Sequence, residues 1–151
     1  MDLRDATPED LDGIRALVAA VGVEYGFEPE PEGADEDLYG ASGCYFEAGG
    51  MLRVIVEEGV IVGVVGVVPH GRGVWELRKI YLEAGRRGMG QGRRLLDEAL
   101  AFARGRGAVK LVLQSSTMLR EALQLYERAG FRRVEADARS STCDVAMELE
   151  L

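Results

Sequence analysis

The chain has 151 residues, of which 47% are hydrophobic, and this length is sufficient to bury the core of one domain. Its formal net charge of -8 argues against a general nucleic-acid binder, whose affinity would depend on a basic face. No stretch reaches the apolar length of a membrane span, and residues 1–5 lack the basic-then-apolar order of a secretory signal. Cys44 and Cys143 define no disulfide framework. We therefore expect one cytoplasmic domain over residues 1–151, without nucleic-acid or membrane partners.

Hydrophobic periodicity divides the chain into strands and helices in an order that predicts an α/β domain with a mixed sheet. Apolar residues at helical spacing indicate helices that begin at Thr7, after Gly92 and near Met118. The connection Glu58-Gly59 is typical of a tight hairpin, so the strands on either side of it are expected to be antiparallel. Strands are expected at Leu3–Ala6, Met51–Glu57, Val60–Val68, Val74–Leu82, Val109–Leu113, Phe131–Glu135 and Cys143–Leu151.

Two segments before the hairpin carry more specific signals. Thr7 has the properties of a helix N-cap, with Pro8 in the first turn and Asp10 closing a capping box. Residues 24–37 are rich in carboxylates, prolines and glycines, which predicts a mobile loop that could cap a substrate. An acidic cap would suit a cationic acceptor, although such loops are commonly only solvated.

The run Arg86-Arg87-Gly88-Met89-Gly90-Gln91-Gly92-Arg93-Arg94 is the strongest functional signal in the chain. Its alternate glycines allow the backbone to approach a ligand closely, and the helix that follows directs unsatisfied N–H groups toward it. This arrangement suits a phosphate or pyrophosphate, and a flexible surface turn is the alternative interpretation. A dinucleotide fingerprint would need a glycine at Arg93, and a P-loop would need G-K-S/T, so both are excluded.

Two motifs resemble the GCN5-related N-acetyltransferases (GNAT). Residues 87–92, followed by Leu95-Leu96, are similar to that family's Q/R-x-x-G-x-G/A signature. Leu125–Phe131 is similar to its L-Y-x-x-x-G-F segment, so the motifs span roughly residues 51–135. The resemblance implies a single-domain GNAT-like fold, with a mixed, mostly antiparallel sheet of six to seven strands and about four helices. It also implies an enzyme that uses acetyl-CoA as cofactor and transfers acetyl directly to a primary amine.

By the same resemblance, main-chain groups hold most of the cofactor. The main chain of Ile80, Tyr81 and Leu82 would bond the pantetheine arm, because a strand splayed from its neighbour offers free N–H and C=O groups. The pyrophosphate would be bound by Arg87, Gly88, Met89, Gly90, Gln91, Gly92 and Arg93. Many family members have an asparagine where this chain has Leu119. That polar contact is either absent here or supplied by Ser115, Ser116 or Thr117.

Glu76 is the first candidate catalytic residue. In a histone-modifying branch of the family, an acidic residue six positions before the last apolar residue of this strand is the general base. Glu76 stands in this relation to Leu82. The chemistry needs a base, since reaching the free-amine form of an alkylamine at pH 7 costs ~4.6 kcal/mol. The alternative interpretation is a solvated strand carboxylate paired with Arg78 or Lys79.

Tyr126 is the second candidate. Its spacing from Leu119, Ala122 and Leu123 alone predicts a core aromatic residue. The resemblance implies that its hydroxyl donates a proton or hydrogen bond to the CoA thiolate. Proton transfer from a phenol to a thiolate is uphill by ~2 kcal/mol, which a positioned site can offset.

Other conspicuous residues are expected to be structural. His70, the sole histidine, is expected in an exposed hairpin loop without a metal or catalytic role, and neither cysteine has metal-ligand spacing. Trp75 is expected to pack on the face opposite Glu76. Three tyrosines either line the acceptor pocket or are simply buried: Tyr25, Tyr39 and Tyr45.

The acceptor is expected to be a small-molecule or peptide amine, such as a polyamine, an aminoglycoside-like compound or a lysine side chain. Two alternative functions stay open. One is a non-catalytic acyl-CoA-binding or sensing module, and the other is an enzyme that acylates a hydroxyl or transfers a longer acyl chain. Homodimerisation also stays open.

Overall fold

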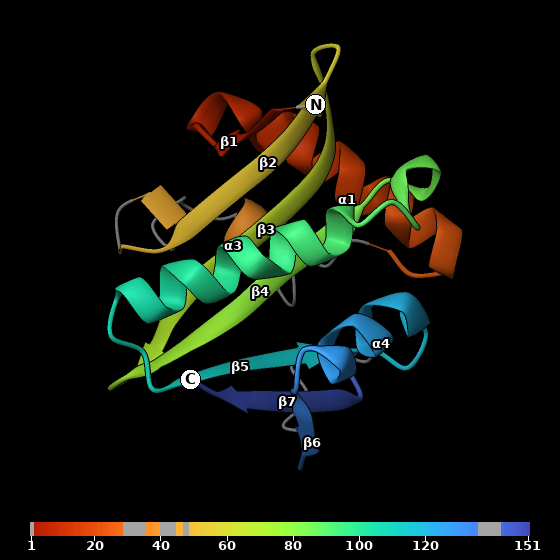
Figure 1. Cartoon of the computed structure of the whole chain (residues 1–151). Coiled ribbons are helices and arrows are strands. Elements are labelled where there is room, and N and C mark those ends of the chain that lie inside the picture. The colour runs from red at the N-terminus through yellow and green to blue at the C-terminus, as the bar shows by residue number, and fades with distance from the viewer. Residues whose placement is uncertain (1, 29–35, 40–44, 47–48, 136–142) are drawn as a thin grey trace.

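The computed structural model describes residues 2–28, 36–39, 45–46, 49–135 and 143–151, and one seven-stranded sheet runs through them (Figure 1). The spatial order is β1-β2-β3-β4-β5-β7-β6. β4 and β5 are parallel, whereas the other neighbouring pairs are antiparallel. The predicted sheet is therefore confirmed. Its strands are β1 (Asp2–Asp5), β2 (Met51–Glu57), β3 (Val60–Gly71), β4 (Val74–Leu82), β5 (Lys110–Ser115), β6 (Arg132–Val134) and β7 (Val145–Glu150).

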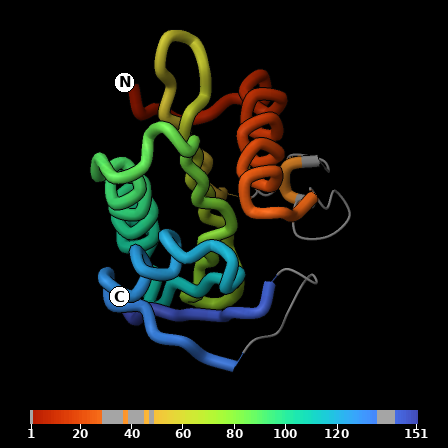
Figure 2. Tube along the Cα trace, turned by 90° about the vertical axis from the view of Figure 1, so that its right-hand side faces the viewer, coloured from red at the N-terminus to blue at the C-terminus, as the bar shows by residue number. Residues whose placement is uncertain are grey.

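Helices cover both faces of the sheet. Figure 2 shows α1 and α3 on opposite sides of the strands, and α4 shares the apolar cluster of α3. The expectation of about four helices is slightly off, because three of the described helices are longer than one turn. The helices are α1 (Leu11–Tyr25), α2 (Glu36–Tyr39), α3 (Gln91–Gly105) and α4 (Arg120–Arg128), with 3-10 turns η1 (Pro8–Asp10) and η3 (Ala84–Arg86).

The first helical segment begins where the capping residues predict. The backbone N–H of Thr7 donates a hydrogen bond of 2.8 Å to Oδ2 of Asp10, and Pro8 follows the cap. The same carboxylate accepts a hydrogen bond from the Arg4 guanidinium. This hydrogen bond is the main reason that the pKa of Asp10 is lowered to about 2. The capping box thus also ties β1 to the entry of α1.

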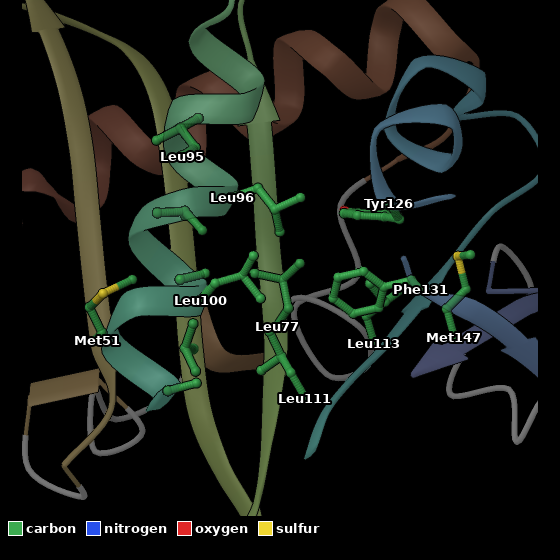
Figure 3. Close-up of a cluster of buried hydrophobic side chains, with 14 of the residues drawn as sticks. Met51, Leu77, Leu95, Leu96, Leu100, Leu111, Leu113, Tyr126, Phe131 and Met147 are labelled. Carbon is green, nitrogen blue, oxygen red and sulfur yellow. The ribbon is translucent and has the colours of Figure 1, made fainter. Parts of the chain in front are cut away.

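Two buried apolar clusters hold the helices against the sheet. Each fully buried leucine or isoleucine side chain contributes roughly 2 kcal/mol of hydrophobic free energy. On one face, α1 packs with Ile14, Leu17, Val18 and Val21 against Leu52, Val54, Val64 and Val68. On the other face, shown in Figure 3, α3 and α4 contribute Leu95, Leu96, Ala99, Leu100, Leu123 and Tyr126.

The β2–β3 hairpin has the tight turn that the sequence predicts. Glu58 and Gly59 have positive φ values of 51° and 79°, as both central residues of a type I′ turn require. Further along β3, a Cβ atom on Gly66 would lie 2.8 Å from the ring of Tyr45, so this position needs glycine. The register against β4 shifts immediately after Gly66. This bulge and close contact agree with the expectation for a glycine within this strand.

β4 and β5 pair along only part of their lengths. The pairing runs from Val74 opposite Lys110 to Leu77 opposite Leu113, and β4 then continues to Leu82 beside β3 alone. The two parallel strands therefore separate after Leu77. On the side that faces away from β3, the N–H and C=O groups of β4 after Leu77 are not paired with any strand of the described structure. This is the arrangement that the predicted splayed strand requires.

Some predicted boundaries were wrong. Val109 lies outside β5 with 61% exposure, and β5 alternates between buried and half-buried residues. The reason is that only Leu111 and Leu113 face the α3 cluster among the predicted strand residues. α4 begins at Arg120 rather than Met118.

Candidate active site

A cavity of about 420 Å³ lies beside the unpaired end of β4. Four parts of the fold line it: the end of α1, the end of β4, the turn that begins α3, and one side of α4 along its length. The hydrophobic lining comes mainly from β4 and α4, and cations come from Arg87, Arg93 and Arg128. A cavity with an apolar floor and a cationic side suits an amphipathic anionic ligand.

The turn before α3 has a backbone conformation that requires glycine. Gly88 and Gly90 have φ values of 80° and 79°, in the left-handed region. Gly90 is the N-cap of α3, and the N–H of Arg94 is bonded to its carbonyl at 3.1 Å. The N–H groups of residues 91–93 precede this first helical bond, so they point out of the helix end. This end of α3 can hold an anion through main-chain donors and the helix dipole.

The structure brings most of the predicted cofactor residues together around this cavity. Met89 and Gln91 are the exceptions: Met89 is 57% exposed and neither residue is among the lining. Oε1 of Gln91 is buried without a hydrogen-bond partner. The predicted residues that do line the cavity are Ile80, Tyr81, Leu82, Arg87, Gly88, Gly90, Gly92 and Arg93.

The Arg87 side chain is already engaged by the protein. It forms an ion pair with Glu24, and its Nη2 donates a hydrogen bond of 2.9 Å to the carbonyl of Leu82. Its guanidinium also lies over the ring of Tyr25, at 5.3 Å from the ring centroid. Arg87 therefore ties the end of α1 to the end of β4, beside the cavity.

Tyr25 and Glu121 form a second bridge across the cavity. The Tyr25 hydroxyl donates a hydrogen bond of 2.7 Å to Oε2 of Glu121, and both residues line the cavity. Burial, followed by this hydrogen bond, raises the pKa of Tyr25 to about 12. Tyr25 was one of three tyrosines considered for a pocket, but Glu121 was not singled out. No local pattern could pair residues 96 positions apart.

Tyr126 is buried, with 4% exposure, and does not line the cavity. Its ring packs at a tilt against Phe131 with centroids 5.7 Å apart, and Figure 3 shows both rings near Leu113 and Met147. The core position that its helical spacing predicts is confirmed. Burial and, to a smaller extent, the neighbouring Tyr81 raise the pKa of Tyr126 well above the ordinary range. Its hydroxyl is therefore a hydrogen-bond donor throughout the physiological pH range.

Glu76 is also buried, with 3% exposure, so the alternative interpretation of a solvated carboxylate was wrong. Its Oε1 lies 3.7 Å from Nη1 of Arg78, which is one of the two predicted partners. The other predicted partner, Lys79, instead pairs with Asp37 at 3.3 Å. Glu76 is on β4 one residue before the pairing with β5 ends. Glu76 therefore lies next to the point at which β4 and β5 separate.

His70 is not in a hairpin loop, contrary to expectation. β3 extends to Gly71, so His70 is a strand residue, and its Nδ1 lies 3.8 Å from Oε1 of Glu76. The β4 residue next to Glu76, Trp75, packs edge-on against Phe102 of α3, as expected for the opposite face. Sequence reasoning missed the pairing of His70 with Glu76 because it depends on the register of the two strands.

Asp37, in the described end of the acidic segment, is held by charged and polar contacts to β4 and Tyr45. Asp37 is buried, accepts a hydrogen bond from the Tyr45 hydroxyl, and lies 3.5 Å from Nη2 of Arg78 and 3.3 Å from Nζ of Lys79. Residues 29–35, Cys44 and the side chain of Tyr39 lie outside the described part of the chain. Asp37 therefore holds α2 against β4 on the face of α1.

The polar residues after β5 have partners of their own. Thr117 bonds Asp144 through both its N–H and its hydroxyl, each at 2.9 Å, and Ser116 Oγ accepts from the N–H of Met118 at 3.2 Å. Leu119 lines the cavity. The cavity wall at this position is therefore apolar.

A split between parallel strands, next to a glycine turn that begins a helix, can hold an elongated anionic ligand that bears amide groups. Comparison with known proteins makes the assignment specific. The model of the acetyltransferase (GNAT) family matches residues 15–131, so the chain belongs to this family and is an acetyltransferase. Members of the family use acetyl-CoA as their acetyl donor.

Individual relatives agree with this assignment. The chain is 30% identical to the uncharacterized N-acetyltransferase YjgM of Escherichia coli over 138 residues, which cover 88% of this chain and 83% of YjgM. A GNAT-family acetyltransferase from Staphylococcus aureus has the same fold with a TM-score of 0.89, at 16% identity and 99% and 98% coverage. The PaiA N-acetyltransferase of Thermoplasma acidophilum, solved in complex with coenzyme A, has a TM-score of 0.76, at 16% identity and 99% and 98% coverage.

No helix among the described residues is long and apolar enough to cross a membrane.

Proposed function

We propose that residues 1–151 form a single cytoplasmic domain that transfers acetyl from acetyl-CoA directly to a primary amine of a small molecule or peptide. One observation carries the proposal. The cavity joins the unpaired end of β4 to the glycine turn at the start of α3, so an amide-bearing arm and a pyrophosphate can be held at once.

The residues present fit acetyl-CoA. The main chain of β4 at residues 80–82 can bond the amides of the pantetheine arm, since β5 does not occupy that edge. The turn at Gly88 and Gly90 and the first N–H groups of α3 suit the pyrophosphate, with Arg93 supplying positive charge. When bound, acetyl-CoA supplies an acetyl group on a thioester sulfur that leaves as a thiolate.

Glu76 is proposed to take the proton of the acceptor ammonium. Its position next to the point at which β4 and β5 separate, in a buried setting, favours this role over that of a surface carboxylate. The guanidinium of Arg78 lies 3.7 Å from Oε1 of Glu76 and supplies a positive charge beside the carboxylate.

Tyr126 is proposed to donate a hydrogen bond to the departing sulfur. Because burial raises its pKa, full proton transfer to a thiolate costs more than it would from an ordinary phenol. Its role is therefore the supply of a fixed O–H dipole, with the proton retained on oxygen for most of the step.

The test has two parts that use the intact chain. Calorimetry with acetyl-CoA should show binding at one site, and release of the CoA thiol should follow the addition of an amine from a panel of polyamines, aminoglycosides, amino acids and peptides. Binding without release for every amine would indicate a non-catalytic acyl-CoA module. Release with alcohols alone, or only with longer acyl-CoA donors, would indicate the other acyl transfers.

A further inference from the structure

His70 and Glu76 form a pair that connects a buried carboxylate to solvent. Nδ1 of His70 lies 3.8 Å from Oε1 of Glu76. The His70 side chain is 47% exposed, whereas that of Glu76 is 4% exposed. Neither residue lines the cavity beside β4. The pair thus offers Glu76 a contact with solvent that does not pass through the cofactor cavity.

The strand register explains how His70 reaches Glu76. Val68 is opposite Glu76, Pro69 is opposite Trp75, and Gly71 is opposite Val74, so His70 is an extra residue on β3. Since alternate residues of a strand share a face, His70 lies on the same face as Val68, and therefore on the face of Glu76.

The other charged groups around Glu76 in the described structure are poorly suited to carry its proton. Arg78 lies 3.7 Å from the same oxygen, but a guanidinium stays charged and accepts no proton. Lys79 and Asp37, the next charges on this face, pair with each other at 3.3 Å. A histidine side chain, in contrast, changes its charge between pH 5 and 8. His70 is therefore the described neighbour of Glu76 whose side chain can both accept and release a proton.

We propose that His70 is a positioning residue that acts through Glu76 and delivers the proton of the acceptor to solvent. This inference rests on the proposed role of Glu76 as the base. An N–H bond of the acceptor ammonium breaks and an O–H bond forms on Glu76. Rotation of the half-exposed imidazole closes the 3.8 Å gap, neutral Nδ1 of His70 takes this proton, and Nε2 releases one to water. Exchange with water then moves the proton left on Nδ1 back to Nε2, which restores the starting tautomer of His70. Glu76 returns to its ionised form, and no other reactant is consumed.

Kinetics across pH 5 to 8 test the relay, with CoA release measured at saturating acceptor. Wild-type kcat should fall toward acid pH as the histidine becomes protonated. His70→Gln should lower kcat about tenfold with little change in KM, and should remove this acid limb. Added imidazole should restore part of the activity of His70→Ala, because the site is half exposed. Unchanged kcat and an unchanged acid limb in His70→Gln would overturn the relay.

Arg72→Gln is the matched control, because Arg72 is an exposed cation in the same β3–β4 hairpin. It should keep the wild-type kcat and pH profile. Equal losses in Arg72→Gln and His70→Gln would show a general effect on the hairpin and would also overturn the proposal.

Nuclear magnetic resonance separates this inference from the proposed function. The chain has one histidine, so its imidazole signals are unique. At a fixed neutral pH these signals should move in Glu76→Gln and stay in place in Arg72→Gln. If no amine is acetylated, the proposed function fails, while the signals still report whether the pair exists. Unmoved signals in Glu76→Gln would refute the pair even in an active enzyme.

Discussion

Tyr25 and Glu121 join the end of α1 to the start of α4 through a hydrogen bond of 2.7 Å that spans 96 positions of the chain. This bond is the largest cause of a lowered pKa at Glu121, while burial and the bond together raise the pKa of Tyr25 to about 12. The donor therefore stays protonated and the acceptor ionised across neutral pH. The bridge is a permanent part of the cavity wall under these conditions.

A double-mutant cycle should detect this bridge. Tyr25→Phe and Glu121→Ala each remove one partner, and their effects on the free energy of unfolding should be non-additive. We expect a coupling free energy of roughly 0.5–1 kcal/mol. This is less than a buried hydrogen bond to a charged group contributes, because solvent screens this partly exposed pair. Urea unfolding of the four proteins gives this value. Additive effects would mean that the bridge does not form in solution.

Glu24→Gln should strengthen acetyl-CoA binding. The Glu24 carboxylate pairs with Arg87 beside the cavity, where it repels an anionic ligand and competes for the guanidinium. Removing one surface charge changes affinity by about 0.5–1 kcal/mol, which is roughly twofold to fivefold. Calorimetry at low and high salt measures the gain, which should shrink as salt screens the charge.

Asp12→Asn is the control for this change. Asp12 is also on α1 and pairs with Arg15, but its side chain is 97% exposed and it does not line the cavity. Its substitution should leave the affinity unchanged. Weaker binding in Glu24→Gln would mean that Glu24 chiefly holds Arg87 in its ligand-binding position.

Gly90→Ala should weaken acetyl-CoA binding by at least about tenfold, since the turn would leave the left-handed conformation that presents its N–H groups. Gly107→Ala is a matched control. Both glycines have similar positive φ values, 79° and 74°, and neither has an atom within 4 Å of an added Cβ. Each substitution should cost about 1–2 kcal/mol of stability.

Thermal unfolding and calorimetry of the two glycine variants separate stability from binding. Gly107 lies beyond the last residue of α3, far along the chain from the turn, and only Gly90 lines the cavity. Equal affinities in the two variants would show that the Gly90 turn does not bind the cofactor.

Tyr126→Phe should lower kcat about tenfold to a hundredfold and leave the acetyl-CoA dissociation constant nearly unchanged. The phenylalanine keeps the packing against Phe131, so the loss would come from the hydroxyl. Because burial raises the pKa of Tyr126, the wild-type enzyme should lose no activity by deprotonation of this residue below about pH 10. An unchanged kcat would leave Tyr126 with a packing role alone.

Asp10→Asn should destabilise the fold at neutral pH and lose this effect in acid. The folded-state pKa of Asp10 is lowered from 3.8 to about 2, mainly by the hydrogen bond from Arg4. A lowered pKa means that the stabilisation is present above the unfolded-state value and disappears as pH falls from about 4 to about 2. We expect about 1 kcal/mol at pH 7, because Arg4 is partly exposed.

Thermal unfolding of wild type and Asp10→Asn over this pH range provides the measurement. Their melting temperatures should converge near pH 2. A constant difference across the range would rule out the ionised Asp10 as the source of the stability.

Local patterns were enough to predict the elements and the glycine turn before α3. The turn at Glu58-Gly59, the capping box at Thr7, and the glycines before α3 each depend on residues within a few positions of one another. Their conformations follow from φ requirements and from local hydrogen bonds. The predicted hairpin and helix start were confirmed for this reason, and Gly88 and Gly90 were found in the left-handed conformation that glycine permits.

The contacts that surround the proposed catalytic residues could not be predicted in the same way. His70 meets Glu76 because the β3–β4 register places Val68 opposite Glu76, and His70 is the next residue along β3 on the same face. Lys79 pairs with Asp37 on α2, in a segment whose sequence predicts a mobile loop. Such pairings are set by the packing of distant elements, and hydrophobic periodicity within one segment carries no information about them.

Transfer of radiolabelled acetyl from acetyl-CoA to an amine tests the central claim most directly. The purified chain would be incubated with labelled acetyl-CoA and the amine panel, and the label in the amine would be measured for wild type, Gly90→Ala and Gly107→Ala. The account predicts a labelled N-acetyl product with wild type and Gly107→Ala, and far less with Gly90→Ala. Absence of label in every amine with wild type, or equal labelling by all three proteins, would contradict it.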